Sequence, residues 1–291
     1  MYNFKTASEL LSLCEKYDAT ISDIMKRREC EISECTIEEI EERMMRSLEI
    51  MKNAVREAIE DPKKSMGGLI GGESRKIYDS LKSGNSISGN VLSKAIAYSM
   101  GVLEVNSSMG LIVAAPTAGS SGVIPGVLLA IKEEFGYSDK EMCDALFNSS
   151  AIGYIAMNNA TVSGAVGGCQ AEIGVASAMA ASAIVELRKG SAEQSLSAAS
   201  TVLMNMLGLV CDPVGGLVEY PCQNRNASGA ANAITAAEIA LSGIKQIIPL
   251  DEMLEIMYKV GRTLPIELRE TALGGCALSK SACERCKVYK K

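Results

Sequence analysis

Three of the ten cysteines lie in or beside turns rich in glycine and proline, where thiol ligands could support metal chemistry. Cys169, Cys211 and Cys222 are separated by 41 and then 10 intervening residues, counted along the sequence. This spacing is unlike the compact pairs of zinc ribbons and ferredoxins, so spacing alone is a weak metal signal. A dispersed three-cysteine site would nevertheless leave one iron of a 4Fe-4S cluster without a thiolate, and an open iron can act as a Lewis acid.

Three turns of small residues also precede expected helices, and such turns can bind an anion. They cover residues 115–122, 161–170 and 211–226; Cys169 lies in the second of them, and Cys211 and Cys222 lie in the third. Helix N-termini present unpaired N–H groups and a partial positive charge, so a substrate carboxylate would fit there. Ordinary helix capping by Ser and Thr is the alternative interpretation of any single turn.

The elements that position these turns are expected to be helices. Apolar residues at spacings of three and four predict an amphipathic helix over residues 33–60, with Thr36 as its N-cap and Glu39 completing a capping box. A glycine-rich connector at residues 67–72 follows. Further stretches rich in Ala, Leu or Met predict helices at 86–109, 123–135, 138–157, 169–187, 192–209, 227–244 and 250–260.

The fold class is therefore expected to be mostly α: a compact, single-domain bundle of buried helices with Gly/Pro-rich site loops. Residues 110–115 are the only reasonable strand candidate. We expect an N-terminal amphipathic helical segment (1–66) that forms one domain with a helical core (67–276), followed by a tail (277–291). The last part of the tail, from Cys283 onward, is basic and expected to be frayed.

Composition excludes several classes of protein. The net charge of -6 argues against nucleic acid or an anionic membrane as the main partner. Two uncharged stretches, 105–131 and 145–171, are long enough to span a membrane, but their Gly, Pro, Asn and Ser residues favour buried helices. The N-terminus lacks a signal-peptide core, so a cytoplasmic location is expected. The chain has no histidine, which removes the commonest general base and metal ligand.

Four segments carry a specific resemblance. The chain resembles the α chain of iron–sulfur-dependent L-serine dehydratases over about residues 36–276, in the stretches APTAGSSGVIP (115–125), SGAVGGCQA (163–171), CDPVGGLVEYPCQNRN (211–226) and LRETALGGC (268–276). The resemblance implies a 4Fe-4S cluster held by Cys169, Cys211 and Cys222. It further implies that residues 67–276 are the cluster-binding catalytic core, and that a separate β subunit completes the enzyme as a hetero-oligomer of α and β chains.

The reaction implied by the resemblance is β-elimination of water from L-serine, which yields pyruvate and ammonia. Candidates for holding the substrate carboxylate are Thr117, Ser120 and Ser121, which precede the helix expected at residue 123. Further candidates for substrate or cluster contact are Asn159, Ser163 and Arg225. For Arg225, a structural ion pair with Glu219 or Glu172 is an equal alternative.

This chain could offer Lys, Tyr, Glu or an alkoxide as the general base, but none of these turns contains a convincing one, so we favour the β subunit as its source. Cys283 and Cys286, with Cys276, could be half of a zinc site, but no second pair or histidine completes it. A pyridoxal-phosphate lyase would require an α/β fold that the pattern does not favour. A non-catalytic iron–sulfur sensor or electron carrier is the other alternative, although a carrier would be expected to have four cysteine ligands.

Overall fold

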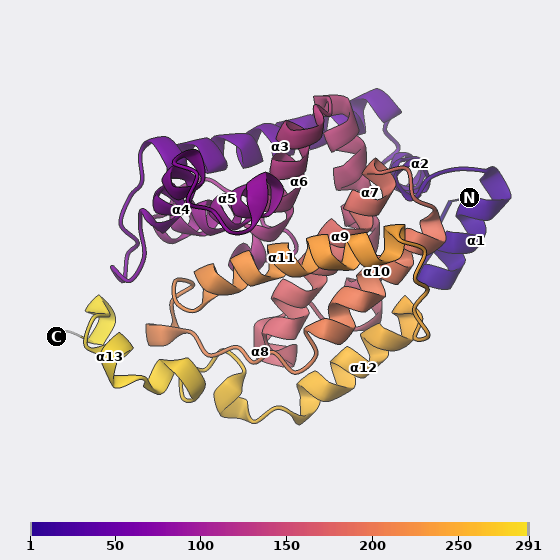
Figure 1. Cartoon of the computed structure of the whole chain (residues 1–291). Helices are drawn as coiled ribbons and strands as arrows, with labels where there is room; N and C mark the ends of the chain where they lie inside the picture. Colours follow the sequence, from indigo (N-terminus) through magenta and orange to yellow (C-terminus); the bar gives the residue numbers. More distant parts are fainter. Residues whose placement is uncertain (1, 290–291) are drawn as a thin grey trace.

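The computed structural model describes residues 2–289, which form a helical fold (Figure 1). Within these residues there is no β-strand, and the single isolated bridge joins Cys211 to Arg269. The α-helices are α1 (Ala7–Tyr17), α2 (Ile21–Ser33), α3 (Ile37–Glu60), α4 (Glu73–Lys82), α5 (Gly89–Ser107), α6 (Val123–Phe135), α7 (Asp139–Asn159), α8 (Gly164–Gly167), α9 (Val175–Leu187), α10 (Ala192–Asn205), α11 (Cys222–Leu241), α12 (Leu250–Thr263) and α13 (Lys280–Cys283).

Short helical segments lie in the connections. Five are 3-10 turns and one, η2, is a π-helical segment that continues directly into α9. They are η1 (Ala118–Ser120), η2 (Gln170–Gly174), η3 (Val214–Gly216), η4 (Ile266–Leu268), η5 (Gly275–Leu278) and η6 (Lys287–Tyr289).

Capping boxes determine where many of the helices begin. In each box the side chain of the N-cap residue accepts from the third helical N–H, and the third side chain accepts from the N-cap backbone. This arrangement confirms the predicted Thr36–Glu39 box of α3. The same pattern occurs at α1 (Thr6 and Glu9), α2 (Thr20 and Asp23), α7 (Ser138 and Glu141) and α10 (Ser191 and Gln194).

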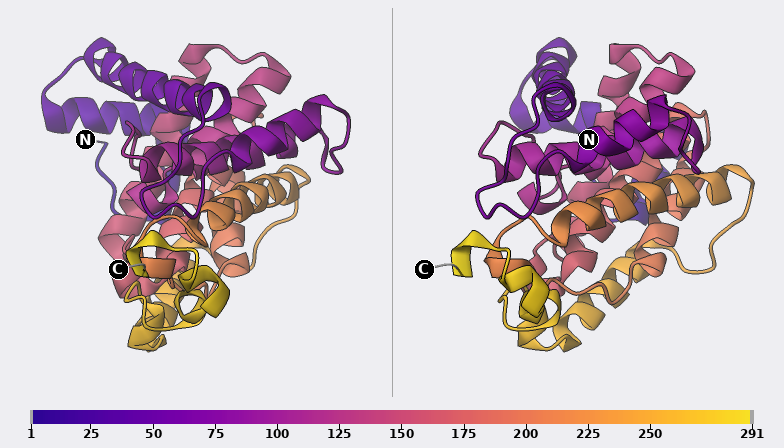
Figure 2. Two further views of the ribbon diagram at one scale, coloured as in Figure 1. Left: turned by 90° about the vertical axis from the view of Figure 1, so that its left-hand side faces the viewer. Right: turned by 60° about the vertical axis from the view of Figure 1, so that its left-hand side comes forward.

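Helix α9 lies at the centre of the molecule. Every residue of α9 except Glu186 is buried, and α9 packs against α6, α7, α10 and α11. Helix α11 crosses the middle, with α3 to α6 above it and α8 and α12 below it in the view of Figure 1. In both views of Figure 2, α12 and the C-terminal segment lie at the bottom of the molecule. Alanine-rich faces of α9 and α11 allow the close packing between them.

The mostly helical fold class predicted from the sequence is confirmed. The helix expected at 123–135 has those bounds, but α10 ends at Asn205 and α11 begins at Cys222, five residues earlier than expected. The sequence prediction lacks α1, α2 and α4. The strand expected at 110–115 is wrong, because that segment has no partner strand and is irregular.

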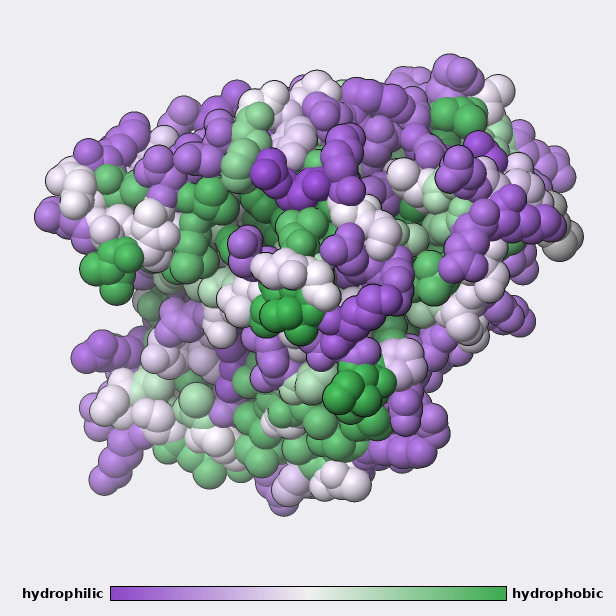
Figure 3. Space-filling view, turned by 45° about the vertical axis from the view of Figure 1, so that its right-hand side comes forward, coloured by the Kyte–Doolittle hydropathy of each residue, from purple (hydrophilic) through white to green (hydrophobic). Residues whose placement is uncertain are grey.

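Hydrophobic and hydrophilic residues are unevenly distributed over the surface. On the face in Figure 3, hydrophobic residues gather in the lower half and hydrophilic residues cover much of the upper half. No helix among residues 2–289 is both long and apolar enough to cross a membrane.

Cys286 is fully buried and the Lys287 N–H donates to Gly67 O at 3.0 Å, so the expected fraying of the tail is wrong as far as Lys287. Residues 290 and 291 lie outside the described part, and the division into residues 1–66, 67–276 and 277–291 stays a prediction.

Candidate metal centre

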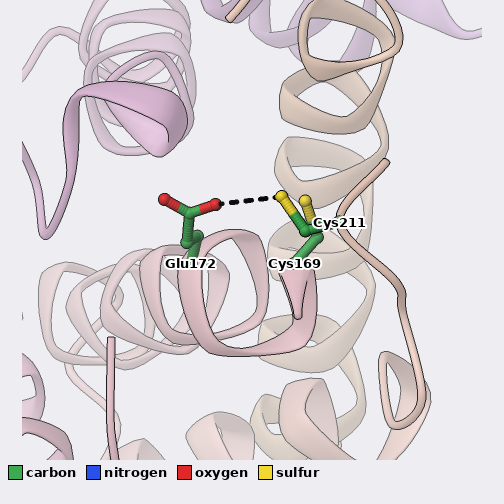
Figure 4. A group of neighbouring side chains, drawn as sticks. All are labelled: Cys169, Glu172 and Cys211. Carbon is green, nitrogen blue, oxygen red and sulfur yellow. Dashed lines mark hydrogen bonds between the residues drawn. The ribbon is translucent and has the colours of Figure 1, made fainter. Parts of the chain in front are cut away.

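Two of the three predicted cysteines meet beside a carboxylate. The Sγ atoms of Cys169 and Cys211 and a carboxylate oxygen of Glu172 all lie within 4.8 Å of one another (Figure 4). Cys169 and Glu172 are three residues apart on one helical turn, so both side chains lie on the same face. π-Helical turns of the kind that contains Glu172 occur frequently at functional sites.

Cys211 comes from the connection between α10 and α11 and is held there by backbone contacts. Its N–H donates to Leu268 O at 2.8 Å, and its carbonyl accepts from Glu270 N–H at 2.7 Å. These are the contacts of the isolated bridge, and they join the cysteine turn to the segment after α12. The side chain of Cys211 is buried.

Cys222 is the first residue of α11 and is also buried. It lies outside the 4.8 Å group, and burial, together with the nearby Cys169, raises the pKa of its thiol. A hydrogen bond with Cys169, together with burial, raises the pKa of Cys211 well above the usual thiol range. These thiols therefore keep their protons at neutral pH unless a metal cation displaces them.

The chemistry of the donor atoms matches that of the expected iron–sulfur cluster. Three buried sulfur atoms come from separate turns, and the chain offers no imidazole ligand. Thiolates are the ligands that iron–sulfur clusters use, so the residues fit this group. By contrast, Cys276, Cys283 and Cys286 form no three-ligand group within the described residues, and the Cys283 thiol donates to Ala277 O at 3.2 Å.

Arg225 forms an ion pair that the sequence did not indicate. Its Nη2 lies 2.6 Å from Asp212 Oδ1, so the ion pairs considered with Glu219 and Glu172 are wrong. Arg225 Nη1 donates to Val210 O at 2.8 Å and to the Cys169 sulfur at 3.6 Å. This guanidinium thus joins the turn of Cys211 to Cys169.

The turn before α6 reaches the same site through Thr117. Its Oγ1 donates to Glu172 Oε1 at 2.9 Å and lies 3.1 Å from Ser120 Oγ. Ser121 Oγ donates to Ala118 O at 2.8 Å, within its own turn. Both serines are fully buried, and Thr117 is the one of these three hydroxyls that donates to Glu172.

Asn226 of α11 fixes this turn in place. Its Nδ2 donates to Gly119 O at 2.8 Å, and its Oδ1 accepts from Gly122 N–H at 3.1 Å. The expected anion-binding turn is therefore attached to the helix that begins with Cys222.

The other two predicted residues lie at the end of α7 and just before α8: Asn159 is the last residue of α7, and Ser163 is the N-cap of α8. Asn159 is exposed, and its Nδ2 donates to Lys5 O at 2.6 Å and Ile155 O at 2.8 Å, which are structural contacts. Ser163 is half-buried and directly precedes Gly164. A Cβ on Gly164 would lie 2.6 Å from Glu172 Oε2, so the turn of Ser163 borders the site.

Sequence reasoning considered Glu172 only as an ion-pair partner and missed its place in the site. Burial is the main cause that raises its pKa to about 7, and the negative charge of Glu270 adds to the increase. The hydrogen bonds from Thr117 and Cys211 act in the opposite direction. The available signal was its position, three residues after Cys169 in the same motif.

A second buried carboxylate, Glu219, attaches the glycine-rich connector to the turn of Cys222. It accepts from Ser65 Oγ at 2.7 Å, from Gly67 N–H at 2.5 Å and from Leu69 N–H at 3.1 Å. Only 1% of Glu219 is exposed, so the connector and the cysteine turn are joined in the interior.

A large cavity lies elsewhere. It has a volume of about 450 Å³ and is lined by α1, the start of α10 and the connection between α11 and α12. None of the residues predicted for the site lines this cavity.

Comparisons with known proteins agree with these motifs. A family model described as serine dehydratase alpha chain matches residues 16–277. A Bacillus subtilis protein named probable L-serine dehydratase, alpha chain, is 47% identical, and the alignment covers 97% of this chain and 93% of that protein. The L-serine dehydratase alpha chain of Peptoniphilus asaccharolyticus is 42% identical, with 95% and 94% covered. An L-serine dehydratase of Helicobacter pylori is 36% identical, and 95% of this chain aligns to 62% of that longer protein.

Proposed function

Because this chain belongs to the serine dehydratase alpha chain family, we propose that it is the cluster-binding catalytic subunit of an L-serine dehydratase. Its reaction would be an ammonia-lyase reaction of the hydro-lyase type, which converts L-serine to pyruvate and ammonia by elimination of water. Cys169, Cys211 and Cys222 would hold a 4Fe-4S cluster. When bound, the cluster would supply a Lewis-acidic iron that makes the serine hydroxyl a better leaving group.

The observation that carries this proposal is the meeting of the thiols of Cys169 and Cys211 with a carboxylate and the Thr117 hydroxyl in one buried region. A three-thiol ligand set leaves one iron open to substrate, as catalysis requires, whereas an electron carrier uses four ligands. The cysteines are all unpaired, and all ten lie in the described part of the chain. Free thiols and an oxygen-sensitive cluster both suit the reducing cytoplasm, which we propose as the location.

The residues of the chain would bind and orient the substrate. The turn of Thr117 precedes α6, so its backbone N–H groups and hydroxyl are suited to the carboxylate of L-serine. Ser120 would orient the Thr117 hydroxyl through their 3.1 Å contact, and Ser121 would stabilise the turn from within. Arg225 Nη1 would hold the sulfur of Cys169 in its ligand position. Ser163 remains a proposed substrate contact at the border of the site, and Asn159 a more distant one.

A separate β subunit is proposed as the partner that completes the active site. Relatives named alpha chain match this chain over nearly their whole length, whereas the H. pylori relative continues well beyond the matched region. The chain also exposes large apolar residues beside the site turns, namely Met66, Met109 and Leu111 at 63%, 77% and 70%. Such residues are typical of a protein–protein contact when they gather on one surface. We propose that this partner supplies the base that removes the Cα proton.

Anaerobic reconstitution with iron and sulfide tests the proposal. We expect each of the changes Cys169→Ser, Cys211→Ser and Cys222→Ser to lower the bound iron markedly, while Cys35→Ser serves as the matched control and retains it. L-Serine should change the visible spectrum of the loaded chain, and pyruvate should form in the presence of the β subunit. A spectrum that does not respond to L-serine would contradict substrate binding and favour a carrier. Robust deamination by the loaded chain alone would contradict the role of the partner.

A further inference from the structure

The carboxylate of Glu172 forms no ion pair with a positively charged side chain in the described part of the protein. Among residues 2–289, the ion pairs of the site include Asp212 with Arg225 at 2.6 Å but none that involves Glu172. Its only short contact is the Thr117 hydroxyl at 2.9 Å, because the Cys211 thiol lies 3.8 Å away. A carboxylate can accept about four hydrogen bonds, so Glu172 retains unused acceptor capacity. A buried anion without a partner is unfavourable unless a ligand supplies the missing positive charge.

Glu172 is nevertheless accessible. Between Gly167 and Val185, every residue except Glu172 is buried, and Glu172 alone remains partly exposed. Two glycines lie close to its carboxylate. If these glycines carried a Cβ, the Cβ of Gly164 would lie 2.6 Å from Oε2, and that of Gly119 would lie 3.3 Å from Oε1. The carboxylate is thus held in a fixed position while part of the residue still reaches solvent.

The charges around the site favour a ligand that carries a positive charge of its own. Arg225 is the cation beside Cys169, and Asp212 already neutralises it. Among residues 2–289 no ion pair neutralises Glu172, and the thiolates of a bound cluster would add further negative charge. An α-amino acid carries an ammonium and a carboxylate on the same carbon, so the sites for these two groups must be neighbours. The hydrogen bond from Thr117 to Glu172 makes the turn before α6 such a neighbour.

We propose that Glu172 binds the α-ammonium group of the amino-acid substrate and so selects α-amino acids over hydroxy acids that lack the amine. This inference rests on the proposed function, because it assigns a role within the same active site. Glu172 would be a substrate-binding residue, and it would form no bond to the cluster. The carboxylate of the substrate would then lie toward the turn of Thr117.

The test uses the anaerobic holoenzyme, with the β subunit present, and follows ligand binding through the visible spectrum of the cluster. L-Serine is compared with 3-hydroxypropanoate, which has the same hydroxyl and carboxylate but no ammonium. We expect the Glu172→Gln change to weaken binding of L-serine by about 10- to 100-fold, as the loss of a charged hydrogen bond predicts. Binding of 3-hydroxypropanoate should change little, and the iron content should match that of the unmodified enzyme.

The matched control is Glu186→Gln, which changes a partly buried carboxylate of the adjoining helix outside the site and should leave both affinities unchanged. Glu172→Asp, which keeps the charge, should retain a preference for L-serine. A Glu172→Gln enzyme that keeps the full preference would overturn the inference, as would selective loss of iron, which would make Glu172 a cluster ligand. Equal affinities of the unmodified enzyme for the two ligands would also overturn it. If the unmodified holoenzyme fails to bind L-serine at all, the proposed function itself is wrong.

Discussion

The ion pair between Arg225 and Asp212 should dominate the local stability of the metal centre, and the change Arg225→Met tests this. The side chains of Asp212 and Arg225 are 3% and 14% exposed, so Arg225→Met would leave the Asp212 carboxylate buried without its counter-ion. Breaking a buried pair from one side costs about 3–5 kcal/mol. The Cys276 N–H, 2.6 Å from Asp212 Oδ2, remains as a partner, which places the expected loss near the lower end, at about 3 kcal/mol. Loss of the donor to Val210 O adds about 1 kcal/mol.

The measurement is urea unfolding of the cluster-free chain under reductant, which reports the free energy of unfolding directly. The double change Asp212→Asn with Arg225→Met removes both charges and should be less destabilised than Arg225→Met alone. Lys245→Met is the surface control, because Lys245 is 78% exposed and its pair with Glu193 should contribute less than about 1 kcal/mol. A free energy of unfolding of Arg225→Met within about 1 kcal/mol of that of the unmodified chain would contradict the expected role of the ion pair. So would a double change that costs as much as the two single changes together.

Two further changes test the site and the core. Gly164→Ala should lower the bound iron after reconstitution, because the new Cβ would lie 2.6 Å from the Glu172 carboxylate, whereas Gly174→Ala meets only ordinary contacts of 3.7 Å and should retain it. Equal iron in both variants would contradict the tight packing at Gly164. Burial raises the pKa of Glu186, so the chain loses unfolding free energy as the pH rises from the unfolded pKa through the folded one. Glu186→Gln should therefore show a smaller decline in urea unfolding as the pH rises above the ordinary pKa of 4.5, and parallel declines in the two proteins would contradict this.

Some helix boundaries could be predicted from the sequence, because residues only a few positions apart determine them. The box of Thr36 and Glu39 and the helix from Val123 to Phe135 follow from residues within a few positions of each other. The same kind of signal was present at Thr6 and Thr20, whose helices the prediction lacks. A strand requires a distant partner, and no local pattern at residues 110–115 could show that none is present.

The candidate site was predictable only in part, because several of its contacts join residues far apart in the sequence. The cysteines stand in distinctive motifs, and the resemblance of those motifs to one family singled them out. The partner of Arg225 could not be read from the sequence, because Glu219 is engaged by the connector around Gly67, 152 residues away. The contact of Glu172 with Thr117 spans 55 residues and depends on how η2 and the turn before α6 pack together.

The contacts that hold the cysteine turns join residues far apart in the sequence. The candidate site can therefore form only late in synthesis of the chain. A ribosome that has released the chain through α10 has delivered Cys169, but Cys211, Cys222 and Glu219 are not yet synthesised. Cys211 is also held by the Leu268 carbonyl, and Asp212 by the Cys276 N–H, so these turns lack their supports until nearly the whole chain exists. Insertion of the proposed cluster would therefore follow translation, and premature termination before residue 268 would yield a chain with reactive thiols and no assembled site.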